Sequence, residues 1–257
     1  MKALVRRPSP RVADGLVTFV ERLPVDASLA HAQWLGYVEV LEAAGWETVE
    51  VEPADDCPDG VFIEDTLVVR GEVAVIARPG ADSRLAELDG VEAAVTRLGF
   101  TVQRIAPPGT LDGGDVLQVG ETVYVGTGGR TNAEGLRQLR AILEPLGATV
   151  VSVPVRNVLH LKSAVTALPD GSIVGYPPLV EDSELFPRFV PVPEESGAHV
   201  VALGAGKLLV AADCPRTAEL FSGLGYEPAA VDIGEFQKRE GCVTCLSVLL
   251  GSDPGHV

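Results

Sequence analysis

The chain has 257 residues, 46% of them hydrophobic, with 36 acidic against 20 basic side chains and a formal net charge of −16. This length and hydrophobicity can bury a large core, which excludes disorder, and the acidic balance disfavours nucleic acid and anionic membranes as partners. No apolar run reaches the roughly 18 residues of a membrane-spanning helix, and no apolar stretch follows the first arginines as in a secretory signal, so we predict a cytoplasmic protein.

The strongest pattern along the chain is an amphipathic helix that ends at a glycine and is followed at once by a strand. Four copies occur, ending at Gly45, Gly99, Gly147 and Gly225. The predicted helices cover residues 31–44, 82–98, 131–146 and 215–224. Asp82 and Asn132 are predicted helix caps. The long interval before the last glycine leaves room for a fifth, degenerate unit, whose helix would lie near residues 181–186.

Short apolar segments separated by tight turns containing Gly or Asp lie between these helices, which predicts β-hairpins. One unit is then a strand, its hairpin partner, a helix and a further strand. No long linker divides the chain. We therefore predict an α/β fold of five ββαβ units in a ring, as a single domain over residues 1–257.

Each unit carries polar side chains in the apolar segment after its helix and strand. These are Glu64 with Asp65, then Asp112, His160 and Cys245. Equivalent positions in a ring of repeats lie at the same end of the ring. We expect a cysteine, a histidine and several carboxylates to meet in one pocket.

The run GCVTCLSVLL at residues 241–250 is predicted to be a buried strand that holds a nucleophile, Cys245. Cys242 and Cys245 form a CxxC pattern, but a structural zinc site needs four ligands and the chain has no second close pair. A redox disulfide is disfavoured because the motif follows a strand-like segment and does not open a helix. Cys242 and Cys57 are expected to be core cysteines, with Cys242 taking no part in the chemistry.

The other polar groups also have structural explanations. His160 can be a core histidine with satisfied hydrogen bonds, although Lys162 and Ser163 beside it make a costly group to bury without a purpose. The segment from Asp112 to Asp115 can be a hairpin turn, or a loop whose glycines let a ligand approach. The adjacent charges of the segment VFIEDTLVV would need a partner inside a strand, and a cationic ligand would serve.

Six segments, spread from residue 58 to near the end of the sequence, carry a family resemblance. They are PDGVFIEDT (58–66), ARPGADSR (77–84), TLDGGDVL (110–117), GRTNAEG (129–135), LHLKS (159–163) and TCLSVL (244–249). Together they resemble the dimethylarginine dimethylaminohydrolase family, within the superfamily of guanidino-modifying enzymes that includes arginine deiminase. The resemblance implies a pentein-type propeller of five ββαβ units with pseudo-fivefold symmetry.

The resemblance also implies roles for individual residues. Cys245 matches the nucleophile, His160 the general acid and base, and Asp112 the carboxylate that orients the histidine. Residues matching those that bind the substrate are Leu16, Asp59, Phe62, Glu64, Asp65, Arg84, Arg130 and Arg239. Within this set Leu16 corresponds to a lid, Arg84 and Arg130 to the arginines that hold the α-carboxylate, and Arg239 to a backbone contact with the amine.

The implied reaction releases citrulline from Nω-methylated arginines through a covalent thiouronium on the cysteine. A thiolate suits this chemistry because the guanidinium carbon is a poor electrophile. No metal or organic cofactor is expected, the partner is a small zwitterionic guanidino compound, and the chain is expected to be a monomer or a homodimer. Two alternatives stay open: an arginine deiminase-like activity on free arginine, and a non-catalytic arginine-binding or CxxC redox module.

Overall fold

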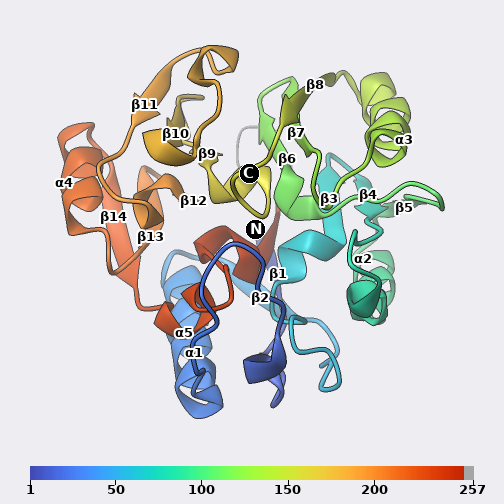
Figure 1. Cartoon of the computed structure of the whole chain (residues 1–257), viewed down its shortest axis with the longest axis horizontal. Helices are drawn as coiled ribbons and strands as arrows, with labels where there is room; N and C mark the ends of the chain where they lie inside the picture. The colour runs from blue at the N-terminus through green and yellow to red at the C-terminus, as the bar shows by residue number, and fades with distance from the viewer. Residues whose placement is uncertain (252–257) are drawn as a thin grey trace.

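Residues 1–251, which the computed structural model describes, form five three-stranded β-sheets arranged around a common centre (Figure 1). The fold is therefore of the α/β class, with a propeller-like arrangement of small sheets. No helix in this described part of the chain combines the length and apolar character that a bilayer crossing requires.

The sheet β3–β4–β5 shows how one unit is built. β3 (Leu67–Arg70) and β4 (Val73–Ile76) form an antiparallel hairpin. The chain then passes through α2 (Val91–Arg97) and returns as β5 (Thr101–Arg104), which pairs parallel with β4. A parallel neighbour requires such a crossover. The order is the predicted one of strand, hairpin partner, helix and strand.

The same order recurs in three further sheets. Two of them use an α-helix as the crossover, whereas the third uses the 3-10 turns Pro177–Leu179 and Ser183–Leu185. This confirms the prediction of a degenerate unit near residues 181–186. The elements are β6 (Val116–Val119), β7 (Thr122–Thr127), α3 (Ala133–Leu143) and β8 (Thr149–Pro154); β9 (Val165–Ala167), β10 (Ile173–Gly175) and β11 (Phe189–Pro191); and β12 (Val201–Gly204), β13 (Lys207–Ala211), α4 (Pro215–Gly223) and β14 (Glu227–Val231).

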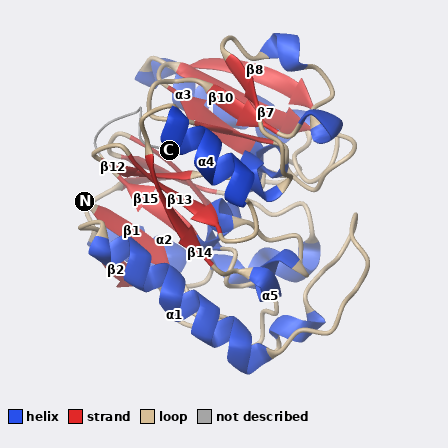
Figure 2. Cartoon of the chain, turned by 90° about the vertical axis from the view of Figure 1, so that its left-hand side faces the viewer, coloured by secondary structure: helices blue, strands red, loops and turns tan. Residues whose placement is uncertain are grey.

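The fifth sheet combines strands from opposite ends of the sequence. β15 (Ser247–Leu250) pairs antiparallel with β1 (Lys2–Val5). The chain then continues through α1 (Ala27–Ala43) to β2 (Glu47–Glu50), which pairs parallel with β1. One unit is thus built from both ends of the described chain. Figure 2 shows α1 running along the outside of this sheet.

Burial differs systematically between the inner and outer strands. All four residues of β3 and of β15 are buried, whereas the residues of β2 and β5 are exposed or half-buried. A short strand covered on both faces has no need of the polar alternation that a half-exposed strand shows. In these two sheets the first strand is therefore buried and the third is not.

The glycines that end the predicted helices have left-handed backbones. Gly45, Gly99, Gly147 and Gly225 have φ values of 90°, 89°, 81° and 90°. Side chains other than glycine rarely adopt this region, so a glycine at these points lets the chain turn directly from helix to strand. The repeat of helix, glycine and strand is confirmed in each case.

Some local predictions are wrong. Asp82 opens a 3-10 turn and does not cap it, whereas Asn132 does cap α3 by accepting a hydrogen bond from the Gly135 N–H at 2.8 Å. The short helix α5 (Gly234–Gln237) was not predicted.

The apolar runs around Glu64 and Cys245 are also not strands throughout. Each first strand is preceded by a 3-10 turn, because the chain must bend sharply to enter the centre of the ring. These five turns are Ile63–Thr66, Gly113–Asp115, Leu161–Ser163, Ser196–Ala198 and Val243–Leu246.

Candidate active site

The predicted catalytic side chains all lie on, or one residue before, the 3-10 turns at the centre of the ring. Asp112 and His160 each precede a turn, and Cys245 lies within one. The turn of Cys245 contacts the turn Ile63–Thr66, which contacts Gly113–Asp115, which in turn contacts Leu161–Ser163. The structure therefore gathers residues that lie up to 181 positions apart between Glu64 and Cys245, as the repeat predicted.

His160 is buried between two carboxylates. Its Nε2 lies 2.9 Å from Asp112 Oδ2, and its Nδ1 lies 3.7 Å from Asp65 Oδ1. Burial disfavours the charged imidazolium, but the surrounding carboxylates, with Asp65 foremost, outweigh burial and raise the pKa of His160 to about 9. This raised pKa favours the imidazolium at neutral pH, which is the form that a general acid needs.

Asp65 is anchored as an ionised carboxylate. It accepts hydrogen bonds from Arg84 Nη1 at 2.6 Å and from the Gly114 N–H at 3.0 Å. Burial alone would raise its pKa, yet the positive charges of His160 and Arg84 lower it to about 2. Gly114 has no space for a side chain, since a Cβ atom would lie 2.7 Å from His160 Nδ1. Gly114 therefore lets Asp65 and His160 approach the backbone closely, whereas the sequence suggested the approach of a ligand.

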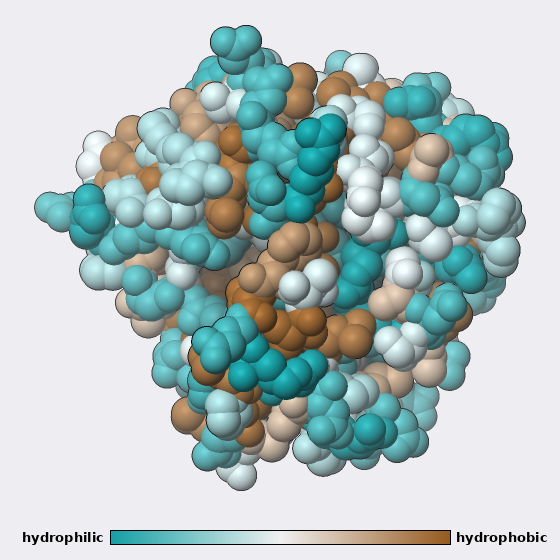
Figure 3. Space-filling view, viewed as in Figure 1, coloured by the Kyte–Doolittle hydropathy of each residue, from teal (hydrophilic) through white to brown (hydrophobic). Residues whose placement is uncertain are grey.

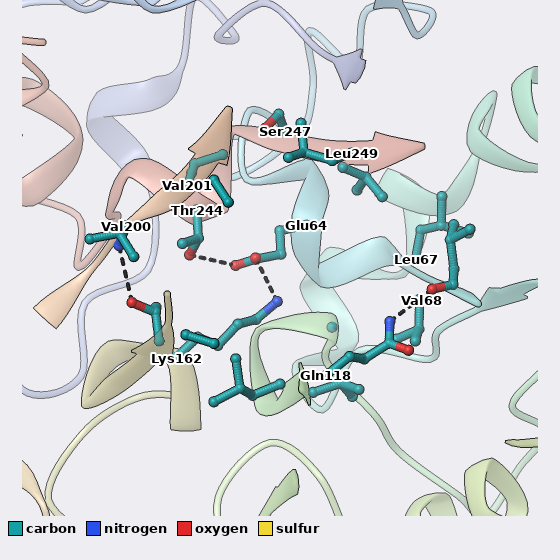
Figure 4. Close-up of a pocket in the computed structure, with 18 residues that line it drawn as sticks. Glu64, Leu67, Val68, Gln118, Lys162, Val200, Val201, Thr244, Ser247 and Leu249 are labelled. Carbon is teal, nitrogen blue, oxygen red and sulfur yellow. Dashed lines mark hydrogen bonds and ion pairs between the residues drawn. The ribbon is translucent and has the colours of Figure 1, made fainter. Parts of the chain in front are cut away.

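Glu64 belongs to a buried polar group next to this site. Lys162 Nζ lies 2.6 Å from Glu64 Oε1, and the Thr244 hydroxyl donates to Glu64 Oε2 at 3.1 Å. Figure 4 shows Lys162 and Thr244 reaching Glu64 from different elements, and all three residues line a cavity together with apolar side chains such as Leu67, Val201 and Leu249. Burial raises the pKa of Glu64 to about 7, although Lys162 opposes that shift. The sequence analysis expected a cationic partner for the charges of VFIEDTLVV, and Lys162 is such a partner for Glu64.

Cys245 is buried and lies against a second thiol. Its Sγ is 3.2 Å from Cys242 Sγ, and it accepts a hydrogen bond from the Cys242 N–H at 3.4 Å. The hydrogen bond with Cys242, burial and the charges of Glu64 and Asp65 raise the pKa of Cys245. Cys242 and Cys57 are both buried, as predicted. The sequence did not predict the contact between Cys242 and Cys245.

Asp115 is a buried acid near His160, a position that the sequence analysis did not predict. Its Oδ2 accepts a hydrogen bond from the Thr131 hydroxyl at 2.6 Å, and its Oδ1 accepts one from the Leu161 N–H at 3.0 Å. Burial raises the pKa of Asp115 to about 6, while the charge of His160 opposes that shift. Asp115 thereby ties the turn that follows His160 to the turn that follows Asp112. The second acid of the DGGD motif was the sequence signal that could have indicated this position.

The predicted lid is held by two carboxylates. The Leu16 N–H donates to both oxygens of Asp59 at 3.1 Å, and Glu240 accepts from the N–H groups of Thr18 at 2.7 Å and Phe19 at 2.6 Å. Apolar side chains gather near the centre of the face in Figure 3, where the blue N-terminal segment of Figure 1 crosses the ring. The exposed apolar residues of this segment are Leu16, Phe19, Val20 and Leu23.

Arg239 and Phe62 contact segments next to the predicted lid and Cys242. Arg239 is buried, and its Nη2 donates to the Ala13 carbonyl at 2.7 Å. Phe62 is buried against the residue before Cys242, since a Cβ atom on Gly241 would lie 2.3 Å from the Phe62 ring. Both residues therefore adjoin the predicted pocket.

The two arginines expected to bind an α-carboxylate differ in their surroundings. Arg130 is 14% exposed, with Nη1 3.5 Å from Asp112 Oδ2. Arg84 is almost fully buried, and besides Asp65 it binds Glu87 through Nε at 2.9 Å and Nη2 at 2.7 Å. In this arrangement Arg84 serves carboxylates of the protein, so binding a substrate carboxylate would require it to move.

One group of metal-type ligands occurs among the described residues. Oxygen or nitrogen atoms of Asp65, Asp112 and His160 lie within 4.8 Å of one another. His160 already contacts Asp112, and Asp65 already forms an ion pair with Arg84. The direct contact of 2.9 Å between His160 and Asp112 is a hydrogen bond that orients the ring. The group fits a proton-transfer site better than a metal centre.

Known proteins are similar to this chain in sequence and in fold. The arginine deiminase family model matches residues 90–213. A dimethylarginine dimethylaminohydrolase of Streptomyces coelicolor is 68% identical over 249 residues, which are 97% of this chain and 96% of that protein. The same enzyme of Pseudomonas aeruginosa is 34% identical over 95% of this chain and 97% of its own length.

Solved structures agree with these relatives. A cysteine-to-serine variant of the Pseudomonas aeruginosa enzyme in complex with citrulline superposes with a TM-score of 0.90 at 32% identity, covering 96% of this chain and 98% of that one. The N-terminal domain of ArgZ superposes with a TM-score of 0.87 at 21% identity, which reflects a shared fold.

The five small sheets and the cysteine, histidine and carboxylate side chains on their central turns define a member of the arginine deiminase superfamily of guanidino-modifying enzymes. Within that superfamily, the chain belongs to the dimethylarginine dimethylaminohydrolase family.

Proposed function

We propose that the chain hydrolyses Nω-methylated arginines, asymmetric dimethylarginine and monomethylarginine, to citrulline and dimethylamine or methylamine. Cys245 is the nucleophile, His160 the general acid and base, and Asp112 the carboxylate that orients His160. The observation that carries this proposal is the placement of His160 between Asp112 and Asp65, with the turn of Asp65 in contact with the Cys245 turn, in a chain 68% identical to a dimethylarginine dimethylaminohydrolase.

The acidic side chains bind the cationic end of the substrate. Glu64 and Asp65 are buried next to the Cys245 turn, and Asp59 lies beneath the lid. A guanidinium placed among carboxylates forms charge-assisted hydrogen bonds. Its positive charge also opposes the effect of Glu64 and Asp65 on the pKa of Cys245, so substrate binding favours the thiolate.

Attack of the Cys245 thiolate on the guanidinium carbon gives a tetrahedral adduct. His160 then donates its proton to the nitrogen that carries the methyl groups, and the C–N bond breaks to release the amine. A thiouronium remains on Cys245. Asp112 holds the imidazole ring in place throughout, as the third member of a triad does.

Neutral His160 then takes a proton from a water molecule as that water attacks the thiouronium carbon. Collapse of the second tetrahedral adduct breaks the C–S bond and releases citrulline with the thiolate restored. Asp65 supports the return of the proton because its negative charge raises the pKa of His160. The histidine thus serves as acid in the first half and as base in the second.

The remaining predicted residues bind and enclose the amino-acid end. Arg130 is placed beside Asp112 at the edge of the site and is the better candidate for the α-carboxylate. Arg84 fixes Asp65, and it reaches the carboxylate only if it releases Glu87. Leu16 covers the site as a lid residue, with Arg239 supporting the same segment through Ala13.

The architecture we propose is a closed five-bladed ββαβ propeller with pseudo-fivefold symmetry, formed as a single catalytic domain. The pairing of β15 with β1 supports closure of the ring. Four free cysteines support a location in the reducing cytoplasm.

Product analysis tests the proposed activity. We expect citrulline with dimethylamine or methylamine from the methylated arginines, and a much slower release of ammonia from arginine. Cys245→Ser abolishes both, whereas Cys57→Ser, which removes a different buried thiol, retains activity. A preference for free arginine would overturn the assignment of substrate.

Arginine deiminase-like hydrolysis of free arginine is the second candidate. The match of residues 90–213 to the arginine deiminase family model favours it. Both activities use the same nucleophile and differ in the amine released, so the ratio of kcat/KM for dimethylarginine and arginine separates them. A non-catalytic arginine-binding or redox module predicts no citrulline from either compound.

A further inference from the structure

The thiol of Cys242 has no part in the proposed hydrolysis, yet it lies directly against the nucleophile. Cys242 is the residue before the 3-10 turn Val243–Leu246, and Cys245 is the third residue of that turn. Their sulfur atoms are 3.2 Å apart, and Cys242 Sγ also lies 3.2 Å from the Thr244 hydroxyl. The two thiols are therefore already in contact in the folded protein.

The backbone between the two cysteines suits a disulfide. The Cys245 N–H donates to the Cys242 carbonyl at 3.1 Å. A turn closed by this i to i+3 hydrogen bond keeps its end Cα atoms within about 7 Å, and disulfides span Cα distances of about 4.4–6.8 Å. The sulfur atoms have to approach by about 1.2 Å to reach the disulfide bond length of about 2.05 Å. Side-chain rotation supplies a shift of this size.

One of the two buried thiols can be reached from a cleft. Cys242 lines a cleft together with Phe19 and His199. A hydrogen bond from Cys245 lowers the pKa of Cys242, and the charge of His199 and the Thr244 hydroxyl act in the same direction. A lowered pKa increases the thiolate fraction of Cys242, and the thiolate is the form that reacts with peroxide.

The other two cysteines provide a contrast. In the described part of the chain, neither Cys57 nor Cys214 has another sulfur within hydrogen-bonding distance, and Cys214 Sγ instead contacts the Ala211 carbonyl at 3.1 Å. Burial raises the pKa of both thiols. Oxidation to a disulfide is thus confined by geometry to one pair.

We propose that Cys242 and Cys245 form a reversible intramolecular disulfide on exposure to hydrogen peroxide, which switches the hydrolase off and protects its nucleophile. The ionised sulfur attacks one peroxide oxygen, the O–O bond breaks, and the products are a sulfenic acid and a hydroxide ion, which takes a proton from solvent to become water. The second thiol then attacks the sulfenic sulfur, the S–O bond breaks, and its proton leaves with the hydroxide as a second water. A thiol or phosphine reductant reverses the step.

The loss of turnover rests on the proposed function, because it requires Cys245 to be the nucleophile, whereas disulfide formation does not. The two are measured separately. Citrulline release before oxidation tests the function. The mass of the peptide that contains both cysteines tests the disulfide, whatever the activity of the protein.

The experiment treats the full chain, previously reduced, with hydrogen peroxide. The wild-type peptide is expected to lose two hydrogen atoms in mass, and only Cys57 and Cys214 then react with a thiol-alkylating reagent after denaturation. Activity disappears in parallel and returns on reduction. Cys214→Ser, the matched control, loses and regains activity in the same way.

Cys242→Ser is compared with its own untreated activity. Without a neighbouring thiol, Cys245 is expected to proceed to sulfinic acid, so activity lost to peroxide does not return on reduction. The proposal is overturned if the wild-type peptide gains oxygen atoms without losing two hydrogens. It is equally overturned if Cys242→Ser recovers as fully as the wild-type protein.

Discussion

Replacement of Asp112 by asparagine tests how the protein keeps His160 protonated. Asp112 supplies a hydrogen bond of 2.9 Å and one of the negative charges that raise the pKa of His160 to about 9. A hydrogen bond to a charged group is worth about 1.5–3 kcal/mol, and one pKa unit corresponds to about 1.36 kcal/mol. We therefore expect the pKa of His160 to fall by about one to two units, and kcat/KM to fall about 10- to 150-fold.

The assay is the pH profile of kcat/KM, with the His160 titration followed independently by NMR. In the native protein, activity that needs the imidazolium declines as pH rises through about 9. In Asp112→Asn this decline moves to lower pH. Asp170→Asn makes the same chemical change in a surface turn and leaves the profile in place. If Asp112→Asn lowers the rate without moving the titration, the carboxylate does not act through the charge of His160.

Three further perturbations follow from the site. The raised pKa of His160 contributes stability that is fully present below pH 6.5 and is lost as pH rises through about 9. Over that interval we expect the free energy of unfolding to fall by about 3 kcal/mol more in the native protein than in His160→Gln, and denaturant titrations at both pH values measure this difference. Gly114→Ala places a Cβ atom 2.7 Å from His160 Nδ1 and should lower kcat/KM by more than about 100-fold, whereas Gly36→Ala has open space and retains activity; equal rates would contradict the close approach. Lys162→Met leaves Glu64 buried without its ion-pair partner and should lower the free energy of unfolding by about 3–5 kcal/mol. The double variant Lys162→Met/Glu64→Gln should regain part of that stability; if it does not, loss of the ion pair is not the cause of the destabilisation.

The repeat architecture was predictable because it depends on local rules. A glycine with positive φ must end each helix where the chain turns at once into a strand, and Gly45 and Gly225 adopt the same φ of 90°. The short tight turns between apolar segments identify the hairpins for a similar reason. These local signals recur often enough to give the number of sheets.

The central turns were not predictable because their composition matches that of the strands they precede. Glu64 and Cys245 lie in apolar runs that continue into β3 and β15, and both runs are buried throughout. Hydropathy cannot mark the point where such a run changes from a 3-10 turn to a strand. The same turn brings Cys242 to Cys245, so the contact between the thiols depends on a bend that the pattern conceals.

The sequence also could not predict which charged or polar groups far apart in the chain contact each other. Lys162 lies 98 positions from Glu64, and Glu240 lies 221 positions from Phe19. The first pair depends on how two central turns meet and the second on how the N-terminal segment lies over the ring, and no local pattern specifies either. The positions of the charged residues could be identified, but not which of them neutralise each other.

The covalent intermediate on Cys245 is the central claim, and rapid acid quenching of turnover followed by mass spectrometry tests it most directly. During hydrolysis of asymmetric dimethylarginine, we expect the peptide containing Cys245 to carry the mass of the substrate less dimethylamine. Cys245→Ser is expected to show neither this adduct nor citrulline. An adduct located on another residue, or citrulline formation by Cys245→Ser, would contradict the mechanism.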